Sequence, residues 1–191
     1  MRKFKVALDI DGCIWDLVGP WLEEYNKLSS HEDVSVNDIK SYYINEYVTY
    51  PEVLYSILDM PKFWGKLNLY DGVYESIKSI NERPDVDLVI ATSTSYKTCR
   101  EKYDRLFELL PMIDEKQLVV TSRKDILSVH FMVDDWENNL RHMARSGNGV
   151  PILINQPYNA AFTAETFGIL RAKNLKTAIK AIEGYINVNM F

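Results

Sequence analysis

The segment 4–12 most constrains what this chain can fold into, because an apolar strand pattern ends there in two carboxylates and a glycine. Residues i and i+2 of a strand face the same side, so Asp9 and Asp11 are expected roughly 6–7 Å apart on one side. Two like charges so placed repel each other unless a cation or a shared proton relieves them. Gly12 allows a tight turn and a close approach of a ligand to the backbone. The pattern predicts an anion-processing, metal-dependent site at the end of a buried strand.

Composition limits the classes of protein and partner. A chain of 191 residues predicts one domain, or one domain with an insertion, and a hydrophobic fraction of 47% is ample for a packed core. The net charge of −5 argues against a nucleic-acid polymer as partner, since such polymers need a broad basic surface. A small phosphate ligand remains compatible with this charge, because a bound cation can reverse the local field.

The cysteines and the apolar runs indicate a compartment. Cys13 and Cys99 are isolated thiols, which fit a reducing cytoplasm better than a disulfide scaffold. No secretory signal precedes the first strand, and no apolar run is long enough for a membrane span. We therefore expect a cytoplasmic protein without a membrane partner.

Short apolar runs that end in polar residues alternate with segments of helical period. The expected strands are 4–10, 86–91, 118–120, 131–133 and 151–154, and the expected helices between and after them are 73–82, 97–110, 136–144 and 175–186. Such alternation predicts right-handed βαβ units. The expected fold class is α/β, with a mostly parallel sheet flanked by helices.

A long stretch without strands follows the first strand. It contains expected helices at 15–28, 37–43 and 51–58. A connection of this length has structure of its own, so we interpret it as a small helical cap inserted after strand 1. The expected domains are a core of residues 1–14 and 72–191 and a cap of residues 15–71. The cap would lie over the strand ends, where open α/β sheets bind ligands.

Candidate site residues follow separate strands and should therefore meet in space. Four carboxylates suit Mg²⁺, which prefers hard oxygen ligands: Asp9, Asp11, Asp134 and Asp135. Thr92 and Ser93 are expected to open a helix, whose free N–H groups favour a phosphate. Lys124 could add a point charge on phosphoryl oxygens.

Each residue also has a structural interpretation. A strand-end Asp can cap a turn, Asp134 and Asp135 can cap the helix from Trp136, and Thr92 with Ser93 can be a plain N-cap. A lone lysine such as Lys124 is more often solvated at the surface. It is the joint occurrence of these residues in this order, on these strands, that favours the functional interpretation.

The order of these residues resembles the four motifs of the haloacid dehalogenase-like phosphohydrolases. Within that superfamily, residues 9–16 resemble the extended first motif of the 5′(3′)-deoxyribonucleotidases, and residues 60–67 with Asp71-Gly72 resemble the segment where their cap rejoins the core. The chain departs from the family pattern at Thr94, where proline is usual, and at Leu17, where an aromatic is usual. Both departures bear on substrate fit.

The resemblance implies a Rossmann-like doubly wound, mostly parallel sheet with helices on both faces and a small helical cap inserted after strand 1. It also implies a mechanism and a set of ligands. Asp9 would be the nucleophile that forms an aspartyl-phosphate, and Asp11 the general acid and then base. Mg²⁺ would be held by Asp9, the Asp11 backbone carbonyl and Asp134, with Asp135 in support. Phosphate would be bound by Thr92, Ser93 and Lys124. The substrate expected is a small-molecule nucleoside monophosphate, with a homodimer left open, and the candidate substrate-binding residues are Phe63, Trp64, Asp16 and Leu17.

Two other functions remain open from the sequence. A haloacid dehalogenase-like phosphatase for another small phosphorylated metabolite would carry the same motifs. A receiver-type signalling module also combines acidic residues, an Asp phosphoacceptor, Thr or Ser and Lys on a similar sheet. The receiver's phosphoacceptor lies in mid-chain without a helical insertion after strand 1, so the order of motifs here argues against it.

Overall fold

A computed structural model describes residues 3–29 and 33–189. Within these residues it forms one six-stranded parallel sheet of order β3-β2-β1-β4-β5-β6. The strands are β1 (Phe4–Leu8), β2 (Val86–Thr92), β3 (Leu118–Val120), β4 (Phe131–Asp134), β5 (Val150–Ile154) and β6 (Leu170–Ala172). The expected Rossmann-like α/β class is confirmed.

Strand β6 is the element of the sheet that the sequence pattern did not indicate. It has three residues and pairs with β5, Ile152 lying beside Leu170. Three residues are too few to show a strand period, and Leu170 is exposed rather than buried. Its extended form is therefore set by pairing with the neighbouring strand.

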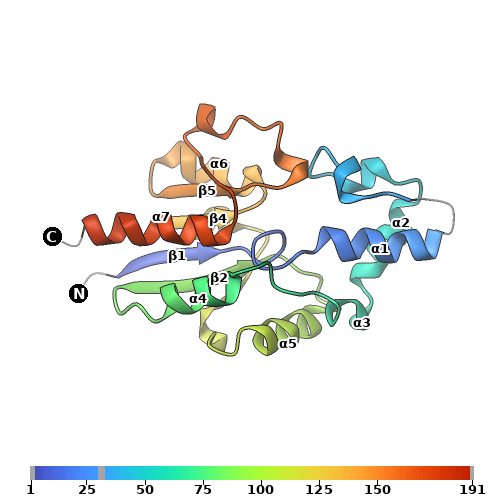
Figure 1. Cartoon of the computed structure of the whole chain (residues 1–191), viewed down its shortest axis with the longest axis horizontal. Helices are drawn as coiled ribbons and strands as arrows, with labels where there is room; N and C mark the ends of the chain where they lie inside the picture. The colour runs from blue at the N-terminus through green and yellow to red at the C-terminus, as the bar shows by residue number, and fades with distance from the viewer. Residues whose placement is uncertain (1–2, 30–32, 190–191) are drawn as a thin grey trace.

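Helices cover both faces of the sheet. Successive side chains of β1 point to opposite faces, since Val6 and Leu8 belong to one hydrophobic cluster and Ala7 belongs to the other. The first cluster takes in residues of α4 (Val73–Asn81), α5 (Cys99–Leu109) and α7 (Leu175–Val188), and the second takes in residues of α6 (Glu137–Ser146). Figure 1 shows α4 and α7 side by side along the sheet, in agreement with their shared core.

Short 3-10 helices connect the main elements of the core. They are η3 (Glu115–Gln117), η4 (Lys124–Ile126), η5 (Pro157–Asn159) and η6 (Ala164–Phe167). Two of them, η4 and η5, follow the carboxyl ends of β3 and β5. They therefore lie at the edge of the sheet where the candidate site residues are expected.

The inserted segment between β1 and α4 is helical as expected, but its elements differ in detail. It contains α1 (Val18–Ser29), η1 (Val36–Asp38), η2 (Ile44–Tyr47), α2 (Pro51–Leu58) and α3 (Pro61–Trp64). The expected helix over 37–43 is wrong, because reciprocal hydrogen bonds between Ser35 and Asp38 close a short turn at η1. The expected helix over 15–28 begins instead at Val18, since Trp15 forms isolated bridges to Asp11 and Leu69.

The insert lies at one end of the molecule, and both chain termini lie toward the other (Figure 1). Its two ends meet beside β1, where the N–H of Tyr70 donates to the carbonyl of Ile14 at 3.1 Å. The division into a core of 1–14 and 72–191 and a cap of 15–71 stays a prediction. Residues 1–2, 30–32 and 190–191 of those ranges lie outside the described residues.

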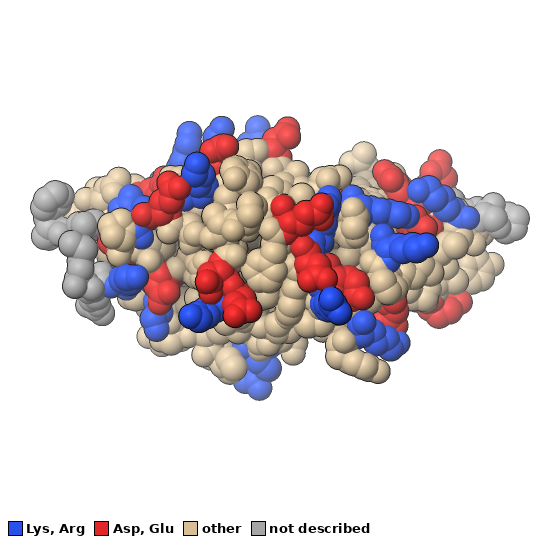
Figure 2. Space-filling model, turned by 90° about the horizontal axis from the view of Figure 1, so that it is seen from below, with Lys and Arg blue, Asp and Glu red and all other residues tan. Residues whose placement is uncertain are grey.

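Charged side chains are mixed on the face seen in Figure 2, where acidic groups gather near the middle and basic ones lie among them. This mixture agrees with the acidic balance of the sequence. Of the helices that the structure describes, none has the length and apolar character needed to cross a membrane.

Candidate active site

Asp9 follows β1 directly and is almost fully buried, with 7% of its surface exposed. Its backbone N–H donates to the carbonyl of Val133 at 2.9 Å, which fixes it between β1 and β4. Burial raises the pKa of its carboxyl to about 7, with the nearby Asp134 and Asp11 adding to the rise and Lys124 opposing it. Repulsion from Asp11, which the sequence pattern predicted, is therefore a smaller cause of the raised pKa than burial.

Lys124, in η4, is buried between two carboxylates. Its Nζ lies 2.7 Å from Asp9 Oδ1 and 2.7 Å from Asp134 Oδ2. Burial alone would lower the pKa of this ammonium, but the two carboxylates outweigh burial and raise it. The solvated-surface interpretation of Lys124 is therefore wrong.

The carboxylate of Asp134 is fully engaged with protein groups. Besides Lys124, it accepts the backbone N–H of Trp136 at 2.9 Å and the Asn139 side-chain amide at 3.0 and 3.1 Å. The amide and the Trp136 N–H tie it to the start of α6. The capping interpretation thus holds, since Asp134 caps the turn into α6 and also contacts Lys124, while its role as a metal ligand stays a prediction.

Asp135 is directed differently from Asp134. One of its oxygens, Oδ2, accepts the Tyr158 hydroxyl, and its backbone carbonyl accepts the Asn159 amide at 2.8 Å. Burial raises the pKa of the Asp135 carboxyl, and the charges of Asp9 and Asp134 raise it further. A second buried carboxyl of raised pKa thus lies beside Asp9.

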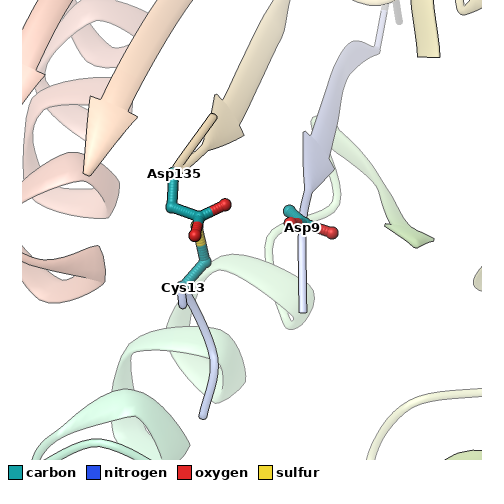
Figure 3. Close-up of side chains that lie close together, drawn as sticks. All are labelled: Asp9, Cys13 and Asp135. Carbon is teal, nitrogen blue, oxygen red and sulfur yellow. The ribbon is translucent and has the colours of Figure 1, made fainter. Parts of the chain in front are cut away.

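A possible metal-ligand cluster is formed by Asp9, Asp135 and Cys13. One ligand atom from each lies within 4.8 Å of the others, and all three residues are buried. Figure 3 shows the two carboxyl groups projecting from the ends of β1 and β4, with the thiol of Cys13 beside the carboxyl group of Asp135. This cluster pairs Asp9 with Asp135, and the expected role of Asp134 as the direct metal ligand stays a prediction.

Thr92 and Ser93 end β2 but do not open a helix, which corrects the sequence expectation. Helix α5 begins only at Cys99, with Thr98 as its N-cap. The hydroxyl of Thr98 donates to the carbonyl of Leu58 at 2.8 Å, so contact with the inserted segment sets where α5 starts. Thr92 is fully buried beneath the site, and Ser93 is exposed to it.

Lys102 is a charged residue of the site that the sequence analysis missed. It lies on α5 and is fully buried, and its Nζ contacts Asp11 Oδ2 at 2.5 Å and Thr92 Oγ1 at 2.9 Å. Lys102 is buried on the same side of α5 as Leu106, four residues later. A lysine on the apolar stripe of a helix was the signal that could have revealed it.

Two adjoining cavities open among these residues. The smaller has a volume of about 120 Å³ and is lined by Asp9, Asp11, Tyr42, Ser93, Ser122, Lys124, Trp136 and Asn139. The larger, of about 320 Å³, lies between the inserted segment and the sheet. Its aromatic and aliphatic lining comes from Leu17, Val18, Trp21, Tyr42, Ile44, Tyr55, Leu58, Trp64 and Tyr158. Its polar lining comes from Asp11, Ser93, Thr94, Ser95, Lys102 and Asp135.

The candidate substrate-binding residues divide between this lining and the core. Trp64 and Leu17 line the larger cavity. Phe63 is buried against the Trp64 ring, with ring centroids 5.6 Å apart, and is absent from the lining among the described residues. Asp16 accepts the Gly19 N–H at 3.1 Å and stabilises the first turn of α1. Neighbouring residues on a helix face different directions, which explains why Phe63 and Trp64 separate.

The chain is similar to known nucleotidases along most of its length. The family model "5′ nucleotidase, deoxy (pyrimidine), cytosolic type C protein" matches residues 2–184. A 5′(3′)-deoxyribonucleotidase of Clostridium acetobutylicum is 25% identical over 162 residues, which cover 83% of this chain and 86% of that protein.

Solved structures share the fold at lower identity. A haloacid dehalogenase family hydrolase of Deinococcus radiodurans, solved with bound phosphate and sodium, has a TM-score of 0.70 at 11% identity and covers 98% of this chain and 97% of its own. A haloacid dehalogenase-like hydrolase of Streptococcus pneumoniae has a TM-score of 0.62 at 12% identity and covers 96% and 98%. These structures share the fold of haloacid dehalogenase-like hydrolases. The match of the family model over almost the whole chain shows that this protein belongs to the 5′ nucleotidase, deoxy (pyrimidine), cytosolic type C family and is a phosphoric monoester hydrolase.

Proposed function

We propose that the protein hydrolyses deoxyribonucleoside and ribonucleoside monophosphates to nucleoside and phosphate. The observation that carries this proposal is the pair of adjoining cavities. The smaller is lined by carboxylates and Lys124 and has the size and charge for a phosphate with a cation, while the larger is lined by aromatic rings that suit a nucleoside. The name of the Clostridium relative supports the same substrate class.

Residues at the boundary between the two cavities fit a Mg²⁺ ion, since Asp9 lines the smaller cavity and Asp135 the larger. The carboxylates of Asp9 and Asp135 approach each other within the distance that a shared cation requires, and Asp9 carries a raised pKa when no cation is present. These two carboxylates and the backbone carbonyl of Asp11 would supply hard oxygen ligands. When bound, Mg²⁺ would lessen the repulsion between Asp9 and the phosphate.

The first half of the proposed reaction uses Asp9 and Asp11. An oxygen of Asp9 would form a bond to phosphorus while the bond from phosphorus to the leaving oxygen breaks. Asp11 would give its proton to that leaving oxygen. Lys124 and the Ser93 backbone would stabilise the charge that spreads over the remaining phosphoryl oxygens.

The second half returns the enzyme to its starting state. Asp11, now a carboxylate, would take a proton from a water molecule, whose oxygen attacks the phosphorus of the aspartyl-phosphate. The bond between phosphorus and Asp9 then breaks, which releases phosphate. The insert would limit access of other water to the site during both halves.

A phosphate-release panel tests this function. We expect turnover of deoxy- and ribonucleoside monophosphates that requires Mg²⁺, stops with excess chelator and returns when Mg²⁺ is restored. Asp9→Asn should lower kcat by several orders of magnitude and retain the fold by circular dichroism. A preference for sugar phosphates over every nucleotide would favour the phosphatase for another metabolite, and near-normal turnover by folded Asp9→Asn would contradict the mechanism.

A further inference from the structure

Lys102 is a fully buried lysine that the proposed reaction does not yet use. Lysine is rarely buried unless its charge is paired, because removing an ammonium from water is costly. Lys102 projects from α5 toward the end of β1, and its Nζ lies 5.2 Å from the centroid of the Trp64 ring. A buried ammonium in this position must be stabilised by acceptor groups around it.

All three donor positions of the Lys102 ammonium are used. It donates to Asp11 Oδ2 at 2.5 Å, to Thr92 Oγ1 at 2.9 Å and to the Ser93 carbonyl at 3.0 Å. These acceptors come from the ends of β1 and β2, so one side chain joins both strand ends. The groups it joins are those that face the leaving group and the phosphate in the proposed function.

The carboxylate of Asp11 is held from two sides. Lys102 contacts Oδ2, and the indole N–H of Trp15 donates to Oδ1 at 2.7 Å. Each carboxylate oxygen has room for a further hydrogen bond, and the Asp11 side chain remains 24% exposed toward the cavities. The two donors therefore fix the plane of the carboxylate and leave its free positions directed at the site.

We propose that Lys102 is a positioning residue that orients Asp11 for proton transfer to the leaving oxygen. This inference rests on the proposed function. As the bond between phosphorus and the leaving oxygen breaks, the bonding pair and the Asp11 proton both go to that oxygen. Asp11 becomes a carboxylate at that moment, and the Lys102 ammonium beside Oδ2 stabilises its new charge. Lys102 lines the larger cavity, whereas Lys124 lines the smaller one, so the two lysines have separate roles.

Substituted phenyl phosphates test this role, because a stable leaving group such as 4-nitrophenolate needs little help from a proton donor. The quantity to measure is kcat/KM, which excludes the later hydrolysis of the aspartyl-phosphate. For Lys102→Met we expect a loss of roughly 10²-fold with phenyl phosphate, as for a weakened general acid, and of less than about threefold with 4-nitrophenyl phosphate. Equal losses with both substrates would show a merely structural role and overturn the proposal.

A double-mutant cycle keeps the test decisive if Lys102→Met is less stable. In an Asp11→Asn background, Lys102→Met should cost almost nothing further with phenyl phosphate, since the group it orients has gone. Additive losses would overturn the proposal. Lys97→Met is the matched control, because Lys97 lies just before α5 in an exposed ion pair with Asp59 and should show unchanged kcat/KM.

Failure of the proposed function can be distinguished from failure of the proposal for Lys102. If the wild type hydrolyses aryl phosphates but no nucleoside monophosphate, the nucleotidase proposal fails while the leaving-group series still reports on Lys102. If the wild type hydrolyses no phosphate ester at all, both proposals fail.

Discussion

Asp9 carries the strongest conflict between folding and chemistry. Its pKa is raised from 3.8 to about 7, chiefly by burial, so between these pH values the folded protein holds a proton that the unfolded chain has lost. The free energy of unfolding should therefore fall as pH rises through this window. The buried Asp9 carboxylate, which we propose as the nucleophile, thus lowers the stability of the metal-free protein at neutral pH.

Asp9→Asn should remove this pH dependence. Without metal at pH 7.5 we expect the variant to melt above the wild type, each kcal/mol gained being about 2–4 °C for a chain of this size. At pH 3, which lies below both pKa values, Asp9 is largely protonated in the folded and the unfolded state, so the two proteins should melt together. Parallel pH profiles measured by differential scanning calorimetry would contradict the expectation.

Asp134 and Asp135 are neighbours in sequence with different surroundings. Asp135→Asn should weaken Mg²⁺ binding, measured by calorimetric titration, by at least about 10-fold, because it removes a charge that faces Asp9. Asp134→Asn should instead chiefly lower the free energy of unfolding, since it deprives buried Lys124 of one partner. The reverse pattern would restore Asp134 as the direct metal ligand.

At the scale of elements, the two aromatic rings of the short helix α3 differ in their contact with the larger cavity. Trp64 lines the larger cavity, and its indole N–H donates to the Leu58 carbonyl at 3.2 Å, which anchors it to α2. Both rings belong to the core cluster, but only Trp64 also lines the cavity. One turn of helix thus contributes both to the lining of the larger cavity and to the packing of the insert.

Trp64→Leu and Phe63→Leu should separate these roles. Stacking of a ring on a base contributes about 1–3 kcal/mol, so Trp64→Leu should lower kcat/KM for a deoxynucleoside monophosphate by roughly 10–100-fold. Turnover of 4-nitrophenyl phosphate should change little. Phe63→Leu should lower the melting temperature without changing the ratio of the two activities. A shared fall in both activities for Trp64→Leu would show that this ring is structural.

For the whole molecule, strand order explains where the site forms. β2 lies on one side of β1 and β4 on the other, so the order in which strands are added to the parallel sheet reverses beside the central strand β1. Loops that leave such a reversal diverge and open a crevice at the carboxyl ends of the strands. Asp9 and Asp135 follow the two strands that flank this point, and the inserted segment covers it (Figure 1).

The sequence alone was sufficient for the α/β class and for most elements, because strand and helix periods are local properties and parallel crossovers have one preferred hand. It also placed Asp9, Asp11, Lys124 and the 134–135 pair at one edge of the sheet, since polar residues at strand ends must meet there. The predicted ends of helices and strands were wrong where tertiary contacts set them. Thr98 bonds to the insert and delays α5, and β6 exists through its pairing with β5.

Only the tertiary structure decided which side chains face one another. Lys102 and Asp11 are separated by 91 residues, yet their charged atoms lie 2.5 Å apart. Asp134 and Asp135 are adjacent, yet one turns to Lys124 and α6 and the other to Asp9 and Tyr158. The direction in which each side chain points is set by the packing of several elements at once, and no local sequence period encodes it. Strand ends bring the residues together, and packing then assigns a contact to each.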